Sequence, residues 1–185
     1  MAESFKIEAR VQMSDFANHE KFMQAALKVA QTALDQGEFP VGCVMVSENR
    51  IVSVGARANS QMGGNELDHA ELVALRALQS SLPETDFSKV TAYSTMEPCL
   101  MCFSALILNG IRNIVYGYED VMGGGSSLDL SSLPPLYSAM QVNVISGVCR
   151  QESLKLFKLF FLDGKNHYCR DSLLARYTID QNSHL

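Results

Sequence analysis

Two short segments of this chain contain the residue types that bind soft metal ions. In Pro98-Cys99-Leu100-Met101-Cys102, two thiols stand three residues apart, a spacing that places both on one face of a helix's first turn. Pro98 suits such a turn because it has no N–H to satisfy. Asp68-His69-Ala70-Glu71 puts an imidazole and a carboxylate at the start of a second expected helix, with Asp68 as its N-cap. One imidazole and two thiolates leave a zinc coordination position vacant, which indicates catalysis rather than a structural site.

Each segment alone also has a plainer interpretation. Asp68-x-x-Glu71 matches a capping box, and Cys-x-x-Cys after a strand matches a thioredoxin-type redox pair. Together, His-x-Glu and Pro-Cys-x-x-Cys should occur by chance on the order of once in a thousand such chains. The combination therefore predicts one Zn²⁺ per chain, bound by His69, Cys99 and Cys102. A non-catalytic zinc or thiol-redox module is the alternative.

Composition limits the class of protein. With 185 residues, 47% hydrophobic and 19% charged, the chain can bury the core of a single domain spanning residues 1–185. No apolar run reaches membrane-spanning length, so we expect no membrane partner. An odd number of cysteines, five, favours a reducing, cytoplasmic location over a disulfide framework. A net charge of −5 argues against a broad nucleic-acid-binding face but permits a local basic patch.

Hydrophobic periodicity predicts alternating helices and strands that would position the two motifs. The apolar residues predict helices over 18–36, 69–80, 98–109 and 151–162, and strands over 41–47, 50–55, 90–95, 111–116 and 142–145. Asn18 is the expected cap of the first helix, and Glu48-Asn49 the turn of a hairpin. This order predicts an α/β fold with one sheet covered by helices on both faces. Residues 1–17 are expected to form a loose N-terminal arm, and residues 163–185 a C-terminal extension with a short docked helix.

The two motifs together resemble the signature of the zinc-dependent cytidine and deoxycytidylate deaminase superfamily. Within it, residues 18–162 are most similar to bacterial tRNA-specific adenosine deaminases. The segments that carry this similarity are Phe39-Pro40-Val41-Gly42, His69-Ala70-Glu71-Leu72-Val73-Ala74-Leu75-Arg76, Glu97-Pro98-Cys99, Val115-Tyr116-Gly117, Asp120 and Phe160-Phe161. The resemblance implies a three-layer α/β/α sandwich with one mixed five-stranded sheet, and a homodimer.

The resemblance also implies a reaction: hydrolytic removal of the exocyclic amine of a nucleobase with release of ammonia. This reaction is most like adenosine-to-inosine deamination in tRNA. The family's tRNA enzymes tend to end in a basic helix, whereas residues 163–185 carry three basic and three acidic residues. Deamination of a free base, nucleoside or nucleotide, such as cytosine, guanine or deoxycytidylate, therefore stays open. Glu71, too far along its turn to bind the metal, is expected to act first as general base and then as general acid.

Further residues are candidates for contacts with the substrate. Asn59 corresponds to an asparagine that binds the base in the family, with a loop-capping role as its alternative. Asp120 either touches a substrate ribose or caps the Gly-rich loop that follows it. Phe39 and Pro40 either line the pocket or pack at the start of a strand. Val41 and Ala70, their neighbours in the two matching motifs, complete the predicted pocket.

Overall fold

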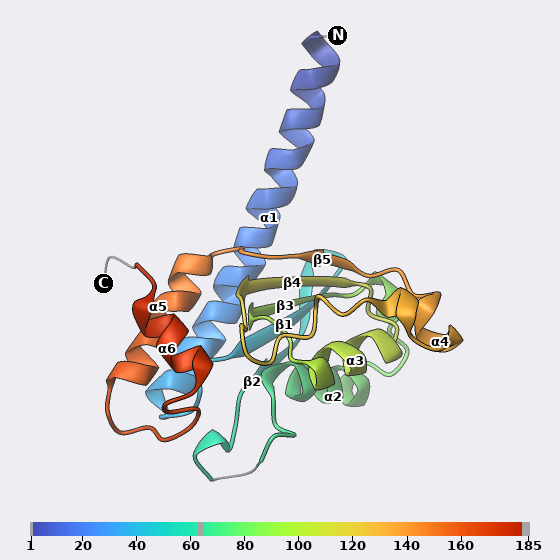
Figure 1. Cartoon of the computed structure of the whole chain (residues 1–185). Coiled ribbons are helices and arrows are strands. Elements are labelled where there is room, and N and C mark those ends of the chain that lie inside the picture. Colours follow the sequence, from blue (N-terminus) through green and yellow to red (C-terminus); the bar gives the residue numbers. More distant parts are fainter. Residues whose placement is uncertain (1, 63–64, 183–185) are drawn as a thin grey trace.

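The computed structural model describes residues 2–62 and 65–182 of the chain, and for residues 2–16 it describes the backbone alone (Figure 1). The helices are α1 (Ala2–Asp35), α2 (Ala70–Ser81), α3 (Leu100–Leu108), α4 (Pro135–Ser138), α5 (Arg150–Leu162) and α6 (Leu173–Asp180). The strands are β1 (Gly42–Ser47), β2 (Arg50–Ala56), β3 (Thr91–Met96), β4 (Asn113–Tyr118) and β5 (Asn143–Ile145).

These strands form one mixed sheet in the order β2-β1-β3-β4-β5. β1 pairs antiparallel with β2 and β3, whereas β3–β4 and β4–β5 are parallel. The β1–β2 hairpin turns at Glu48 and Asn49, whose φ angles of 50° and 61° are those of a two-residue turn that matches the twist of the strands. The expected mixed five-stranded sheet is confirmed.

Helices cover both faces of this sheet because successive strand residues point in opposite directions. In β1, Val44 and Val46 pack in a core with α1 and α5, while Cys43 and Met45 pack in a second core with α2 and α3. The cartoon shows α1 and α5 on one side of the strands and α2 and α3 on the other (Figure 1). The architecture is the three-layer α/β/α sandwich that the sequence predicted.

A glycine in β2 allows the helix that carries the metal motif to lie close against the sheet. A Cβ atom on Gly55 would come within 2.2 Å of the Ala70 carbonyl oxygen and 2.4 Å of the Ala74 amide nitrogen. Only a residue without a side chain tolerates such an approach. The start of α2, and with it His69, is therefore held directly over the end of β2.

The first helix differs from the sequence-based expectation. It begins at Ala2 rather than after Asn18, so the predicted arm continues the helix and extends away from the sheet (Figure 1). Asn18 is not a cap; its amide donates a hydrogen bond to the side chain of Asn49 in the hairpin turn. Gly37, with φ of 77°, follows the end of α1 and has the left-handed backbone typical of a residue that ends a helix.

The C-terminal extension contains the predicted docked helix. Ser172 caps α6 by accepting a hydrogen bond from the amide of Ala175. Leu174 is buried, and α6 lies against α5 (Figure 1). Among the described residues, none of the helices combines the length and apolar character needed to cross a bilayer.

Candidate metal centre and its cavity

His69 and Cys99 occupy equivalent positions at the starts of two helices. Each is the N-cap of its helix, α2 and α3 respectively, with extended backbone angles. The expected cap at Asp68 is wrong, because that carboxylate instead accepts hydrogen bonds from the amide groups of Asn59 and Asn65. Pro98 likewise precedes the cap rather than lying in the first turn. Two helix N-termini, with their partial positive charge, therefore converge on one place.

Three potential ligand atoms meet there. Nδ1 of His69 lies 3.5 Å from Sγ of Cys99 and 3.5 Å from Sγ of Cys102, and the three atoms lie within 4.8 Å of one another. Around a tetrahedral zinc ion, nitrogen and sulfur ligands are separated by about 3.6 Å, given the usual Zn–N and Zn–S bond lengths. The donor set and its spacing thus fit zinc, and three protein ligands are the number found in catalytic zinc sites.

The three ligand groups perturb one another's protonation. A hydrogen bond with Cys102 lowers the pKa of Cys99 to about 4, and a hydrogen bond with Cys99 raises the pKa of His69 to about 9. Shared protons between an imidazole and two sulfurs produce both shifts. A divalent cation binds the same lone pairs and competes with those protons, so metal binding here releases protons.

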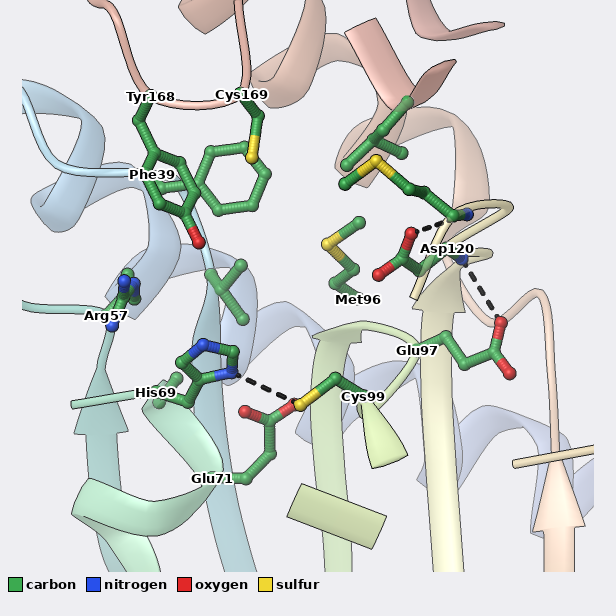
Figure 2. Close-up of a pocket in the computed structure, with 14 residues that line it drawn as sticks. Phe39, Arg57, His69, Glu71, Met96, Glu97, Cys99, Asp120, Tyr168 and Cys169 are labelled. Atoms are coloured by element: carbon green, nitrogen blue, oxygen red, sulfur yellow. Dashed lines mark hydrogen bonds between the residues drawn. The ribbon is translucent and has the colours of Figure 1, made fainter. Parts of the chain in front are cut away.

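Glu71 lies beside these ligands in a buried position. The residue is 3% exposed, and one carboxylate oxygen accepts a hydrogen bond of 2.9 Å from the hydroxyl of Ser94 in β3. Burial raises the pKa of Glu71 above its usual value. Figure 2 shows its carboxylate directed toward Cys99 and His69. A raised pKa suits a carboxyl group that must take up a proton and then give it back.

The candidate metal site forms one wall of a cavity, whose empty space is about 500 Å³ when the part open to solvent is included. Four of the predicted substrate contacts line this cavity: Phe39, Val41, Ala70 and Asp120. Pro40 and Asn59 are not among its lining residues. Asn59 has a left-handed backbone with φ of 58°, and its amide bonds Asp68 at 2.7 Å.

Several lining residues had not been predicted. They are Arg57, Met96, Glu97, Met122, Tyr168, Cys169 and Leu174. Arg57 directly follows β2. Its place at the end of a predicted strand was the signal that could have identified it, because ligand sites in α/β folds often lie at strand ends. Tyr168 and Cys169 come from the C-terminal extension and approach the cavity from the side opposite Glu71 (Figure 2).

Glu97 and Asp120 organise the Gly-rich loop at the cavity rim. Glu97 accepts hydrogen bonds from the backbone amides of Asp120 and Ser126. Asp120 accepts hydrogen bonds from the amides of Met122 and Gly123, as a loop-capping residue does. The predicted loop role of Asp120 is therefore present, and its place in the cavity wall keeps the substrate role open.

A three-layer sandwich that brings one imidazole, two thiols and a buried carboxylate to the starts of two helices defines the class of zinc-dependent nucleobase deaminases. Residues 16–118 match the family model for the cytidine and deoxycytidylate deaminase zinc-binding region. That match spans more than half of the chain and includes all three proposed ligands. The chain belongs to this family.

Relatives within the family agree with this assignment. The chain is 35% identical to tRNA-specific adenosine deaminase 2 of Xenopus laevis over 150 residues, covering 77% of this chain and 85% of the relative. It is 28% identical to the tRNA-specific adenosine deaminase of Streptococcus pyogenes serotype M3, covering 88% and 92% of the two chains. A structure solved in a study of A-to-I editing by tRNA:A34 deaminases superposes with a TM-score of 0.62 and 28% identity, covering 74% of this chain and 98% of the other.

Proposed function

We propose that this chain is a zinc-dependent hydrolytic deaminase that converts adenosine to inosine in tRNA. The observation that carries the proposal is the convergence of His69, Cys99 and Cys102 beside the buried carboxylate of Glu71, at the wall of a cavity. The tRNA-specific names of the relatives support the choice of substrate. The overall reaction consumes water and releases ammonia as the amine at C6 of adenine is replaced by oxygen.

In this mechanism, His69, Cys99 and Cys102 would hold the zinc ion. Zinc, when bound, supplies a Lewis acid that makes water acidic near neutral pH. Glu71 takes the proton of the attacking water and delivers it to N1 of the ring, which makes C6 electrophilic. It then transfers a second proton to the departing amine. The hydroxyl of Ser94 keeps the Glu71 carboxylate oriented during both transfers.

The cavity walls suit a flat aromatic ring. Phe39, Val41 and Met96 supply apolar surface, and Ala70 leaves room close to the metal ligands. Apolar walls with a few polar groups are typical of small-molecule binding sites. We propose that these residues sandwich the base and that Asp120 contacts the attached ribose. Asn59 acts on the base indirectly in this proposal, through Asp68 and the loop that leads to His69.

A second candidate is a deaminase of a free base, nucleoside or nucleotide. The arginines of the C-terminal extension favour it, because their side chains bond backbone oxygens of the extension itself. Arg170 donates to the carbonyls of Gly164 and Asn166, and Arg176 to that of Asp171. Guanidinium groups engaged in this way offer fewer donors to RNA phosphates.

Ammonia release distinguishes the two candidates. The zinc-loaded chain should be incubated with tRNA, adenosine, cytosine, guanine and deoxycytidylate, with the Glu71→Ala variant as the blank. Inosine in tRNA, with no ammonia from small substrates, supports the first candidate. Ammonia from one small substrate alone supports the second. No metal and no ammonia in any mixture, with a Cys99–Cys102 disulfide, would leave the redox module.

We also propose that the chain forms a homodimer in the cytoplasm. The helix α3 is strongly apolar, yet the leucines at its two ends, Leu100 and Leu108, are 54% and 50% exposed. Covering such leucines is a common role of a subunit interface. All five cysteines, each within the described residues, are free thiols, which suits a reducing compartment. Light scattering of the purified chain tests the dimer, and cell fractionation tests the location.

A further inference from the structure

One carboxylate oxygen outside the candidate ligand set gathers three partners from separate parts of the chain. Oε2 of Glu66 lies 3.0 Å from Nε2 of His69, 3.0 Å from the hydroxyl of Tyr168 and 3.3 Å from Nη2 of Arg57. The Arg57 nitrogen also donates to the carbonyl oxygen of Asn65 at 2.8 Å. Although the Glu66 side chain is 55% exposed, its charged oxygen is surrounded by donors.

The bond to His69 bears directly on how that imidazole presents its metal-binding nitrogen. Nδ1 faces the two sulfurs, so this nitrogen must carry a free lone pair when a metal binds. The ring proton must then be on Nε2, the nitrogen that faces Glu66. A carboxylate at this position selects the required tautomer, fixes the ring's rotation and increases the basicity of Nδ1.

We propose that Glu66 is a positioning residue for the metal ligand His69 and that Arg57 and Tyr168 hold Glu66 in place. This role acts through His69 and involves no contact with the substrate. It rests on the zinc centre of the proposed function and is independent of which base is deaminated.

The contacts of Tyr168 explain why a residue of the C-terminal extension takes part. Its ring packs against that of Phe39, with 5.2 Å between centroids, and the guanidinium of Arg57 lies 5.3 Å from its centroid. The Tyr168 hydroxyl is thereby aimed at Glu66. Arg57 is 3% exposed, and its charge needs a nearby anion to offset the loss of water. Glu66 supplies that anion, so the same oxygen serves both a buried cation and the imidazole.

Zinc retention tests this role without reference to activity. The zinc-loaded wild-type chain and its Glu66→Ala and Glu66→Gln variants should be titrated with a chromogenic chelator such as 4-(2-pyridylazo)resorcinol. We expect Glu66→Ala to weaken zinc binding about 10- to 100-fold, the usual cost of losing such an outer hydrogen bond. Glu66→Gln should lie between Glu66→Ala and wild type, because its amide oxygen still accepts from Nε2–H but carries no charge.

A matched control is available elsewhere in the chain. Glu119 also accepts hydrogen bonds from an arginine and a tyrosine, Arg150 and Tyr177, but its described contacts do not include a metal ligand. Glu119→Ala should lower thermal stability and leave zinc binding within about twofold of wild type. If Glu66→Ala binds zinc as tightly as wild type, or if Glu119→Ala weakens zinc equally, the positioning role is wrong.

A second measurement keeps the proposal testable if Glu66→Ala does not fold. Cobalt(II) can replace zinc, and its visible absorption reports the geometry of the ligands. The Glu66→Gln spectrum should shift from that of wild type, whereas the Glu119→Gln spectrum should coincide with it; coincidence of all three would overturn the proposal. A wild-type chain that binds neither metal would instead refute the proposed function, so the two failures can be told apart.

Discussion

Two glutamates connect the C-terminal extension to the rest of the protein, and each does so through hydrogen bonds with one arginine and one tyrosine. Glu66 is bonded by Arg57 and Tyr168, and Glu119 by Arg150 and Tyr177. In each cluster the tyrosine belongs to the extension and the glutamate to the body of the chain. The glutamates differ in one further contact, since Glu66 also reaches His69.

The extra contact with His69 shows how one kind of hydrogen-bonded cluster can contribute to stability alone in one place and also to metal binding in another. The Glu119 cluster packs near the core, where the Arg150 guanidinium lies 5.1 Å from the ring centroid of Tyr118. Its effects should be confined to stability. The Glu66 cluster lies beside a candidate metal ligand, so disrupting this cluster should lower metal affinity as well as stability. The following predictions separate these two readouts.

The largest effect should follow removal of a candidate metal ligand near the Glu66 cluster. Cys102→Ala leaves one thiolate and one imidazole, too few donors to hold zinc tightly, because structural and catalytic sites use three or four protein ligands. We expect loss of bound zinc and of all ammonia release. Elemental analysis and an ammonia assay check both, with Cys43→Ala as a control for loss of a buried thiol. A Cys102→Ala protein that kept stoichiometric zinc would contradict the ligand set.

Glu71→Gln should have the next largest effect, on turnover alone. The amide keeps the shape of the side chain and can still accept the hydrogen bond from Ser94, but it cannot take a proton. Loss of a general acid–base group costs about 10²- to 10⁴-fold, and Glu71 is proposed to act in several steps. We expect kcat to fall by at least about 10³-fold with zinc content unchanged. Activity within tenfold of wild type would remove Glu71 from this role.

The activity of Glu71→Gln would also test a role that was predicted from the sequence alone. The zinc motifs could be predicted because each is local: Cys99 and Cys102 share one turn, and His69 and Glu71 share another. The strands and most of the helices followed from periodicity in the same way, but the first 16 residues of α1 and the short helix α4 did not. Such patterns depend on neighbours within about four residues, so no tertiary information was needed to identify them.

The parts that were missed depend on distant residues. Asp68 was expected to cap α2 by local rules, but two asparagine amides in the preceding loop compete for its carboxylate. Arg57 and Tyr168 are 111 positions apart in sequence, and only the folded chain brings them to one oxygen of Glu66. No local pattern distinguishes Tyr168 from the other tyrosines, which is why the cavity's second wall could not be predicted.

Removing one hydroxyl from each cluster should give smaller and clearly different effects. Tyr168→Phe and Tyr177→Phe keep the rings and delete the bonds to Glu66 and Glu119, of 3.0 and 2.6 Å. A hydrogen bond to a charged group typically contributes about 1.5–3 kcal/mol, less where the group is exposed as Glu66 is. Tyr168→Phe should weaken zinc binding by about two- to fivefold, whereas Tyr177→Phe should lower only the free energy of unfolding, by about 1 kcal/mol. Equal zinc affinities in the two variants would remove the distinction between the clusters.

The smallest effect should be a pH dependence of the stability that the Glu119 cluster contributes. Partial burial alone would raise the pKa of Glu119, but hydrogen bonds from Arg150 and Tyr177 outweigh it and lower this pKa in the folded chain. The stabilisation is therefore present above the unfolded pKa, near 4.3, and is lost as pH falls through the lower folded value. The amide introduced by Glu119→Gln does not titrate, so the stability difference between wild type and this variant should be constant from about pH 6 to 7 and shrink below about pH 4.5. Urea unfolding midpoints across this range measure it, and the zinc site, identical in both proteins, cancels in the difference. A difference that stays constant down to about pH 3 would show that the ion pair of Glu119 with Arg150 contributes no pH-dependent stability.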